Sequence, residues 1–261
     1  MCKTAGPWTA IIACCRPAPI LRLTDSSAVR DGPEFPAEAS GASVVIFDCN
    51  GVLVDSEPLA TAIVSQEFMR AGFPLTPEVV ARYFTGRRPA DMFAEVENAA
   101  RRKLPPNFSD TVASVILRRF RRELRATHHA EYALSWLRGP KCVASSSSHE
   151  RIRVSLESTG LIRFFEPNLF SASDVRKGKP APDLFLHVAG QLHVNPSECL
   201  VVEDSPVGVA AGVAAGMTVI GFVGGSHTGS QLDTVLRGAG ARSVISDMRA
   251  LKSAIIDLRG W

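Results

Sequence analysis

Five short, continuous runs of apolar and β-branched residues constrain this 261-residue chain more than any other feature. Such a run is typical of a strand that is buried on both faces of a parallel sheet. Helical patterns separate the later runs, and an alternation of strands and helices indicates a doubly wound sheet. We therefore predict an α/β fold with a Rossmann-like, doubly wound parallel sheet, whose strands cover 43–47, 141–144, 200–202, 217–222 and 243–245.

The first two runs are separated by a long insertion that is dominated by helical patterns. Its expected helices cover 58–71, 77–84, 89–101 and 108–127. We interpret 58–128 as a helical cap domain, inserted into an α/β core made of 41–57 and 129–261. The first forty residues are rich in Pro, Ala and Ser without a sustained period, so we interpret 1–40 as a flexible N-terminal tail.

Composition excludes several classes of protein. The net charge of +3 is too small to indicate a nucleic-acid partner, and the apolar stretch 201–223 is interrupted by Glu203 and Asp204, so it cannot span a membrane. The six cysteines include no CxxC pair, which indicates free thiols in a reducing compartment. We expect a cytoplasmic monomer or weak homo-oligomer that binds neither nucleic acid nor membrane. Five histidines without metal-ligand spacing are interpreted as structural or surface residues: His128, His129, His149, His187 and His193.

Polar side chains follow three of the predicted strands at one edge of the sheet, and a lysine precedes one of the predicted helices. Asp48 follows the first strand, and Ser145 follows the second. Lys179 precedes a helix, and Glu203-Asp204 ends the strand that begins at 200. In an open parallel sheet, ligands bind at the carboxyl ends of the strands. We therefore expect an acid that could act as a nucleophile, a hydroxyl cluster, a lysine and two further acids to converge there.

These motifs, in this order, resemble those of the haloacid dehalogenase-like (HAD) hydrolases. The resemblance covers residues 43 to about 250 and is to the phosphatase and β-phosphoglucomutase branch, which carries a helical cap. It implies a phosphoric monoester hydrolase that acts on a small phosphorylated metabolite. Asp48 would be the nucleophile that forms an aspartyl-phosphate. Mg²⁺ would be held by Asp48, Glu203, Asp204 and the backbone carbonyl of Asn50, because it requires hard oxygen ligands.

The resemblance also assigns roles around the phosphoryl group. Ser145 and the backbone N–H of Ser146 would hold its oxygens, with Gly51 also in the substrate-binding set. Lys179 would neutralise the negative charge of the transition state. Arg87, in a turn of the cap, would pair with a second anionic group such as a sugar-acid carboxylate, although a plain surface role for this arginine fits equally well.

Position 50 departs from the family pattern. Family phosphatases usually read Asp-x-Asp in the first motif, whereas this chain reads Asp48-Cys49-Asn50. An asparagine amide cannot perform the proton transfers of the second aspartate, and general acid–base catalysis contributes roughly 10²- to 10⁴-fold in rate. Three interpretations stay open: a slow phosphatase, a pseudo-enzyme that binds a phosphorylated ligand, or an asparagine introduced by engineering or sequencing. A sugar-phosphate mutase would need the same missing acid.

Overall fold

The computed structural model describes residues 44–84, 89–226, 229 and 231–259. The described residues form two compact units. One covers 60–116, and the other joins 44–59 to the residues from 117 onward. The tail predicted over 1–40 lies outside the described residues.

The larger unit contains a six-stranded sheet in which every pair of neighbouring strands is parallel, in the order β3-β2-β1-β4-β5-β6. The doubly wound α/β core predicted from the sequence is therefore confirmed. The strand order reverses between β1 and β4, which is where such sheets bind ligands. The strands are β1 (Val44–Phe47), β2 (Lys141–Ser145), β3 (Leu169–Ser171), β4 (Cys199–Glu203), β5 (Thr218–Phe222) and β6 (Ser243–Ile245).

The two central strands are buried along their whole length, as their apolar composition requires. All four residues of β1 and all five of β4 are buried, and Ile46 of β1 pairs with Val201 of β4. Both of these side chains belong to the cluster that packs against Leu184, Phe185 and the neighbouring helices. Three cysteines of this unit are free and buried, as expected: Cys49, Cys142 and Cys199.

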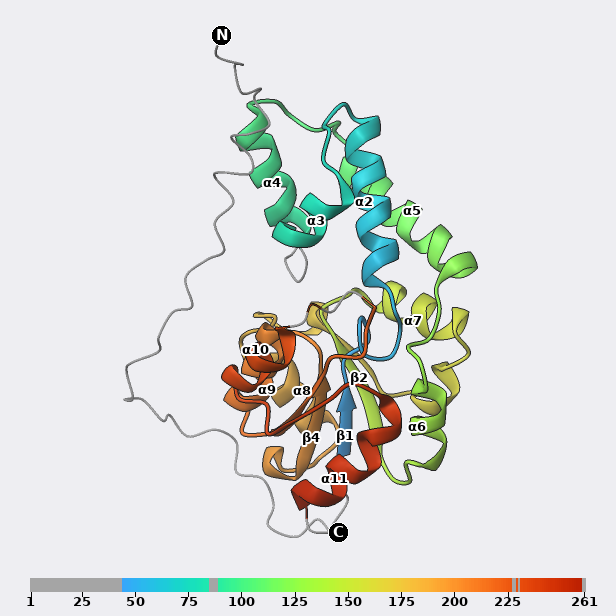
Figure 1. Ribbon diagram of the computed structural model, residues 1–261, viewed down its shortest axis with the longest axis vertical. Helices are drawn as coiled ribbons and strands as arrows, with labels where there is room; N and C mark the ends of the chain where they lie inside the picture. The colour runs from blue at the N-terminus through green and yellow to red at the C-terminus, as the bar shows by residue number, and fades with distance from the viewer. Residues whose placement is uncertain (1–43, 85–88, 227–228, 230, 260–261) are drawn as a thin grey trace, which may run out of the picture. The chain divides into compact units, whose positions relative to one another are not determined.

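Helices cover both faces of the sheet (Figure 1). On one face lie α8 (Asp183–Gln191), α9 (Pro206–Ala214) and α10 (Leu232–Gly238), and on the other lie α6 (Ala130–Trp136), α7 (His149–Ser158) and α11 (Leu251–Arg259). The short 3₁₀ helices are η1 (Ile162–Phe164), η2 (Ala172–Asp174), η3 (Pro196–Glu198) and η4 (Met248–Ala250). The sequence did not predict β3, α6 or α10.

The apolar stretch 201–223 forms most of β4, all of α9 and β5, and the residues that join them. Its apolar composition serves burial between helix and sheet, since Gly212 of α9 lies so close to β5 that an added Cβ would be 2.7 Å from Val219 Cγ2. None of the helices in the described part of the chain combines the length and the apolar character that crossing a membrane requires.

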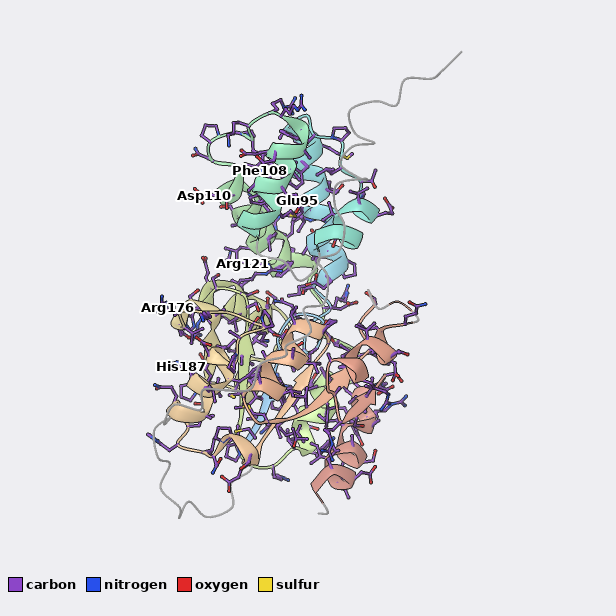
Figure 2. All side chains as sticks on the ribbon, turned by 90° about the vertical axis from the view of Figure 1, so that its left-hand side faces the viewer. Glu95, Phe108, Asp110, Arg121, Arg176 and His187 are labelled. Atoms are coloured by element: carbon purple, nitrogen blue, oxygen red, sulfur yellow. The ribbon has the colours of Figure 1, made fainter. Side chains whose placement is uncertain are left out.

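The smaller unit is helical and is built around phenylalanine rings. It contains most of α2 (Glu57–Arg70), all of α3 (Pro77–Phe84) and α4 (Pro89–Ala100), and the first part of α5 (Phe108–Glu123). The rings of Phe68 and Phe108 lie 4.9 Å apart between centroids, and that of Phe93 lies 5.2 Å from Phe108, which Figure 2 labels. Each of these three side chains is buried, so they form the apolar core of the helical unit.

The chain leaves the larger unit and returns to it through two paired segments. Val54 and Ala126 form an antiparallel bridge. The N–H of Thr127 donates to the carbonyl oxygen of Leu53 at 2.9 Å, and the N–H of Asp55 donates to the carbonyl oxygen of Arg125 at 3.0 Å. We call these paired residues, 53–55 and 125–127, the stem. The helix predicted over 108–127 is therefore too long: α5 ends at Glu123 because residues of the stem are committed to extended pairing.

Substitution of Gly212 by Ala tests the close packing of α9 on the sheet. The new methyl group would overlap Val219, and overpacking of a core costs about 1–3 kcal/mol of unfolding free energy. Gly190 of α8 is the matched control, because a Cβ there has open space and Gly→Ala in a helix stabilises by about 0.4–1 kcal/mol. Urea unfolding of both variants should give shifts of opposite sign. Equal shifts would contradict the packing described here.

Candidate active site

Asp48 lies directly after β1, at the carboxyl edge of the sheet. Its N–H donates to the Val202 carbonyl at 3.0 Å, which extends the pairing of β1 with β4 by one residue. The residue is only 7% exposed. Burial raises the pKa of Asp48 to about 8; Lys179 opposes this shift, whereas Glu203 and Asp204 add to it.

Lys179 lies between two of these acids. Its Nζ donates to Asp48 Oδ1 and Glu203 Oε1, each at 2.7 Å, and to the Ala144 carbonyl at 3.0 Å. The side chain is 2% exposed. Burial by itself lowers the pKa of Lys179, but the carboxylates of Asp48 and Glu203 outweigh that effect and raise it. Lys179 is therefore a fixed cation that joins the loop after β3 to the ends of β1, β2 and β4.

Glu203 ends β4 and is held from both sides. Besides Lys179, the N–H and hydroxyl of Ser205 donate to Glu203 Oε2, each at 2.9 Å. Gly208, in the first turn of α9, lies against the same carboxylate, which a Cβ at this position would overlap. Asp204 is also buried. Glu203 is thus a counter-ion of Lys179. The sequence predicted Glu203 only as a metal ligand and did not predict this ion pair.

The donor set fits a hard divalent cation. Asp48, Glu203 and Asp204 supply carboxylate oxygens at the end of two neighbouring strands, and Asn50 adds a backbone carbonyl to the same loop as Asp48. Burial raises the pKa of Asp48, and the negative charges of Glu203 and Asp204 raise it further, whereas Lys179 lowers it. A cation with a preference for oxygen ligands would add positive charge beside these three acids. Mg²⁺ has the required charge and ligand preference.

Asn50 is fixed at both ends of its amide. Its Nδ2 donates to Ser147 Oγ at 2.8 Å, and the buried hydroxyl of Ser56 donates to its Oδ1 at 3.1 Å. Gly51 follows with a φ of 79°, a conformation that glycine adopts without strain. The side chain at position 50 is therefore an anchor between the first-motif loop and the serine run after β2.

The serine run after β2 is itself ordered by hydrogen bonds. Ser145 is buried, and its Oγ accepts from the N–H of Ser147 at 3.3 Å. The hydroxyl of Ser171 donates to the Ser147 carbonyl at 2.7 Å, while Ser146 is exposed. Ser148 caps α7 by accepting from the N–H of Arg151. Asn50 therefore connects the run to the loop that carries Asp48. Arg87, predicted to bind substrate, lies outside the described residues.

Arg151 is a cation that sequence reasoning missed. It lies in the first turn of α7, where its Nε is buried without a hydrogen-bond partner among the residues that the structure describes, and its guanidinium lies 5.1 Å from the centroid of the Phe120 ring. Burial lowers the pKa of Arg151, while the charges of Glu57, Cys49 and Asp48 oppose that shift. The one feature of the sequence that could have pointed to Arg151 is its place in the first turn of the helix that follows the serine run. Its helical position alone gives no indication of burial.

Comparisons with known proteins find relatives of this chain by sequence and by fold. A family model described as a haloacid dehalogenase-like hydrolase matches residues 42–216. The chain is 32% identical over 189 residues to 6-phosphogluconate phosphatase of Escherichia coli K12, which covers 72% of this chain and 86% of that protein. A haloacid dehalogenase-like protein from Agrobacterium tumefaciens superposes with a TM-score of 0.74 at 38% identity, covering 84% of this chain and 99% of that one. A HAD family hydrolase from Deinococcus radiodurans, with bound phosphate and sodium, gives 0.69 at 30% identity, covering 83% and 96%.

Replacement of Lys179 by Met tests whether this lysine neutralises the site. Without it, Asp48 and Glu203 would be buried with no cation between them, and breaking a buried ion pair costs about 3–5 kcal/mol of unfolding free energy. Lys177 is exposed two residues away, so Lys177→Met is the matched control and should stay within about 0.5 kcal/mol of the native chain. Urea unfolding measures both values. Similar values for the two variants would refute the assigned charge balance.

Proposed function

The chain belongs to the haloacid dehalogenase-like hydrolases, and we propose that it is a phosphatase that hydrolyses phosphoric monoesters of small metabolites. The observation that carries this proposal is the pair of 2.7 Å contacts that Lys179 makes with Asp48 and Glu203 at the carboxyl ends of β1 and β4. These contacts support the proposal because they bring the Asp48 carboxyl group, the proposed nucleophile, beside a fixed ammonium group at the switch point of the sheet. Phosphoryl transfer depends on such positioning and charge stabilisation.

Asp48 performs the covalent step in this proposal. A carboxylate oxygen of Asp48 attacks phosphorus and an aspartyl-phosphate forms, while the substrate's ester oxygen leaves with the bonding electrons and takes a proton from solvent. Water then attacks the phosphorus of this acyl phosphate and passes a proton to solvent, which releases inorganic phosphate and regenerates the carboxylate. Lys179 stays bound to the site in both steps, and its ammonium group stabilises the negative charge on the transferring oxygens.

We further propose Mg²⁺ as the cofactor, held by Asp48, Glu203, Asp204 and the backbone carbonyl of Asn50. When bound, the ion would reduce the repulsion between the Asp48 carboxylate and the phosphate dianion and would neutralise developing charge. The support is the chemistry of the donor set and the excess of buried carboxylates over ammonium groups. Burial raises the pKa of Asp48 to about 8, and an added positive charge would lower it.

We also propose that Ser145, Ser146 and Gly51 bind the phosphoryl group of the substrate and that Arg87 pairs with a second anionic group. The relative named 6-phosphogluconate phosphatase suggests phosphorylated sugar acids as the first class to test. The buried free thiols agree with a cytoplasmic enzyme, which we expect to work as a monomer or weak homo-oligomer.

A specific observation favours a second candidate, a pseudo-enzyme that binds a phosphorylated ligand without turnover. The Asn50 amide is engaged by Ser147 and Ser56 and carries no acidic proton. A leaving alkoxide would then have no acid at position 50 to protonate it. The absence of an acid at position 50 also argues against a sugar-phosphate mutase. We favour the slow phosphatase because Asp48, Lys179 and the acidic pair are all present.

Substitution of Asn50 by Asp should increase turnover of unactivated metabolite phosphates by roughly 10²- to 10⁴-fold. Aspartate is isosteric with asparagine; it can still accept from Ser56, and the Ser147 hydroxyl can rotate to donate. p-Nitrophenyl phosphate has a leaving group that needs no proton in the first step, so its hydrolysis should increase less. The measurement is phosphate release with Mg²⁺ from p-nitrophenyl phosphate and a panel that includes phosphorylated sugar acids.

Asp48→Ala provides the blank for this assay, because it removes the nucleophile. An inert native chain together with an active Asn50→Asp variant would favour the pseudo-enzyme. If neither form exceeded the Asp48→Ala blank on any phosphate, the assignment of Asp48, and with it the proposed phosphatase, would be wrong.

Mg²⁺ should raise the melting temperature of the native chain by about 5 °C or more at 100 times its dissociation constant. Asp204→Asn should lose most of this increase, because it removes one carboxylate ligand while keeping the side-chain volume. Asp233, which pairs with Arg237 on the exposed face of α10, is the matched control, and Asp233→Asn should keep the whole increase. A full Mg²⁺ shift in Asp204→Asn would argue against the proposed metal site.

A further inference from the structure

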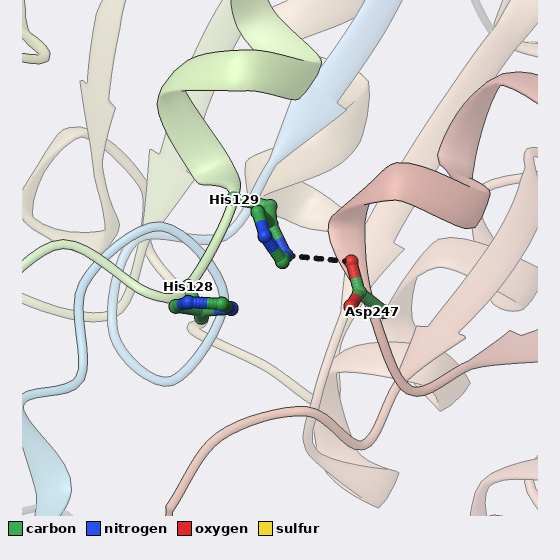
Figure 3. A group of neighbouring side chains, drawn as sticks. All are labelled: His128, His129 and Asp247. Carbon is green, nitrogen blue, oxygen red and sulfur yellow. Dashed lines mark hydrogen bonds and ion pairs between the residues drawn. The ribbon is translucent and has the colours of Figure 1, made fainter.

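A second group of metal-ligating side chains lies in the larger unit, on segments other than those that carry Asp48, Lys179 and Glu203. His128 and His129 directly precede α6, and Asp247 directly precedes η4. One ligand atom from each side chain lies within 4.8 Å of the other two. Figure 3 shows the three side chains, with the His129 ring turned toward the Asp247 carboxylate. We call this group the His–Asp cluster.

One pair in the cluster already has the spacing of ligands around one ion, and a ligand atom of His128 lies within 4.8 Å of both. His129 Nδ1 lies 2.9 Å from Asp247 Oδ1, and the centroids of the two imidazole rings lie 3.8 Å apart. Zinc binds imidazole nitrogen at about 2.0–2.1 Å and carboxylate oxygen at about 2.0–2.2 Å, so ligand atoms around one ion lie roughly 3 Å apart. Small side-chain rotations would therefore bring all three atoms onto one ion.

The backbone holds these side chains in place. His129 has a φ of 62°, in the left-handed region, and Thr127, which directly precedes His128, belongs to the stem. Asp247 caps η4 by accepting from the N–H of Arg249, whose guanidinium also donates to Asp247 Oδ2 at 2.8 Å. Ligating carboxylates in metalloproteins are commonly hydrogen-bonded in this way, which orients them for the metal. The N–H of Arg249 donates to Asp247 Oδ1 at 2.8 Å and its Nε donates at 3.2 Å, and the same oxygen lies 2.9 Å from His129 Nδ1.

We propose that the His–Asp cluster binds a first-row transition metal ion such as Zn²⁺, at a site separate from the Mg²⁺ site. Two imidazoles and one carboxylate suit Zn²⁺, Co²⁺ or Ni²⁺, whereas Mg²⁺ prefers oxygen ligands. Three protein ligands leave at least one coordination position for water. The ion joins the N-terminus of α6 to the N-terminus of η4, two segments that are 118 residues apart in sequence but packed together.

This inference departs from the sequence interpretation of His128 and His129 as structural or surface residues. Adjacent histidines have no metal-ligand spacing in sequence, and the third ligand comes from a segment that only the fold brings near. Side-chain exposures of 25% for His129 and 32% for Asp247 leave the site accessible to an ion from solution.

Co²⁺ titration of the full chain in excess Mg²⁺ tests the proposal, since Mg²⁺ occupies the oxygen site and the visible absorption of Co²⁺ reports nitrogen ligands. The native chain should bind one Co²⁺ that Mg²⁺ does not displace. His128→Gln, His129→Asn and Asp247→Asn should each weaken this binding by at least about 100-fold. Asn is chosen because it tolerates the left-handed conformation at 129 and keeps the helix cap at 247.

His149 provides the matched control, because its Nε2 lies 2.7 Å from Asp174 Oδ1 in a pair with a single histidine. His149→Gln should bind Co²⁺ as the native chain does. Thermal unfolding is the second measurement: Co²⁺ should raise the melting temperature of the native chain and of His149→Gln, but not of the three cluster variants. Absence of Mg²⁺-resistant Co²⁺ binding, undiminished binding in the cluster variants, or an equal loss in His149→Gln would each overturn the proposal.

Discussion

The structure around the candidate active site depends on one buried ammonium group that serves two buried carboxylates. Lys179 is the only residue that contacts both Asp48 and Glu203 through charge-assisted hydrogen bonds among the described residues. Desolvated charges of like sign repel strongly, so the ammonium group of Lys179 lowers the cost of placing the ends of β1 and β4 side by side. The glycine at 208 and the hydroxyl of Ser205 follow from the same need, because they give the Glu203 carboxylate room and hydrogen-bond donors.

Sequence reasoning reached most of the core and the acidic part of the site. Strands buried on both faces leave continuous apolar runs, and β1 and β4 have that composition. Because a parallel sheet gathers the ends of its strands at one edge, the positions of Asp48, Glu203 and Asp204 follow directly from the ends of these runs. Lys179 lies in a loop, and only its motif, together with the family resemblance, indicated that it reaches the same edge.

What the sequence did not reveal depends on contacts between distant segments. β3 has three residues at the edge of the sheet and is only partly buried, so it lacks an apolar run. The end of α5 is set by pairing with Val54, which no helical periodicity can indicate. The completed fold likewise produces three further features: the buried Nε of Arg151, the two hydrogen bonds of Asn50 and the proximity of His129 to Asp247.

The stem has a consequence for how such a chain can change over evolutionary time. It brings the two ends of the helical insertion together through backbone hydrogen bonds that involve no side chain of the insertion itself. The entropy of loop closure grows only with the logarithm of loop length, and a doubling costs about 0.6 kcal/mol. The helical segment could therefore lengthen, shorten or be exchanged for another at little cost to the sheet. The helical insertion and the sheet that carries Asp48 can thereby diverge at different rates.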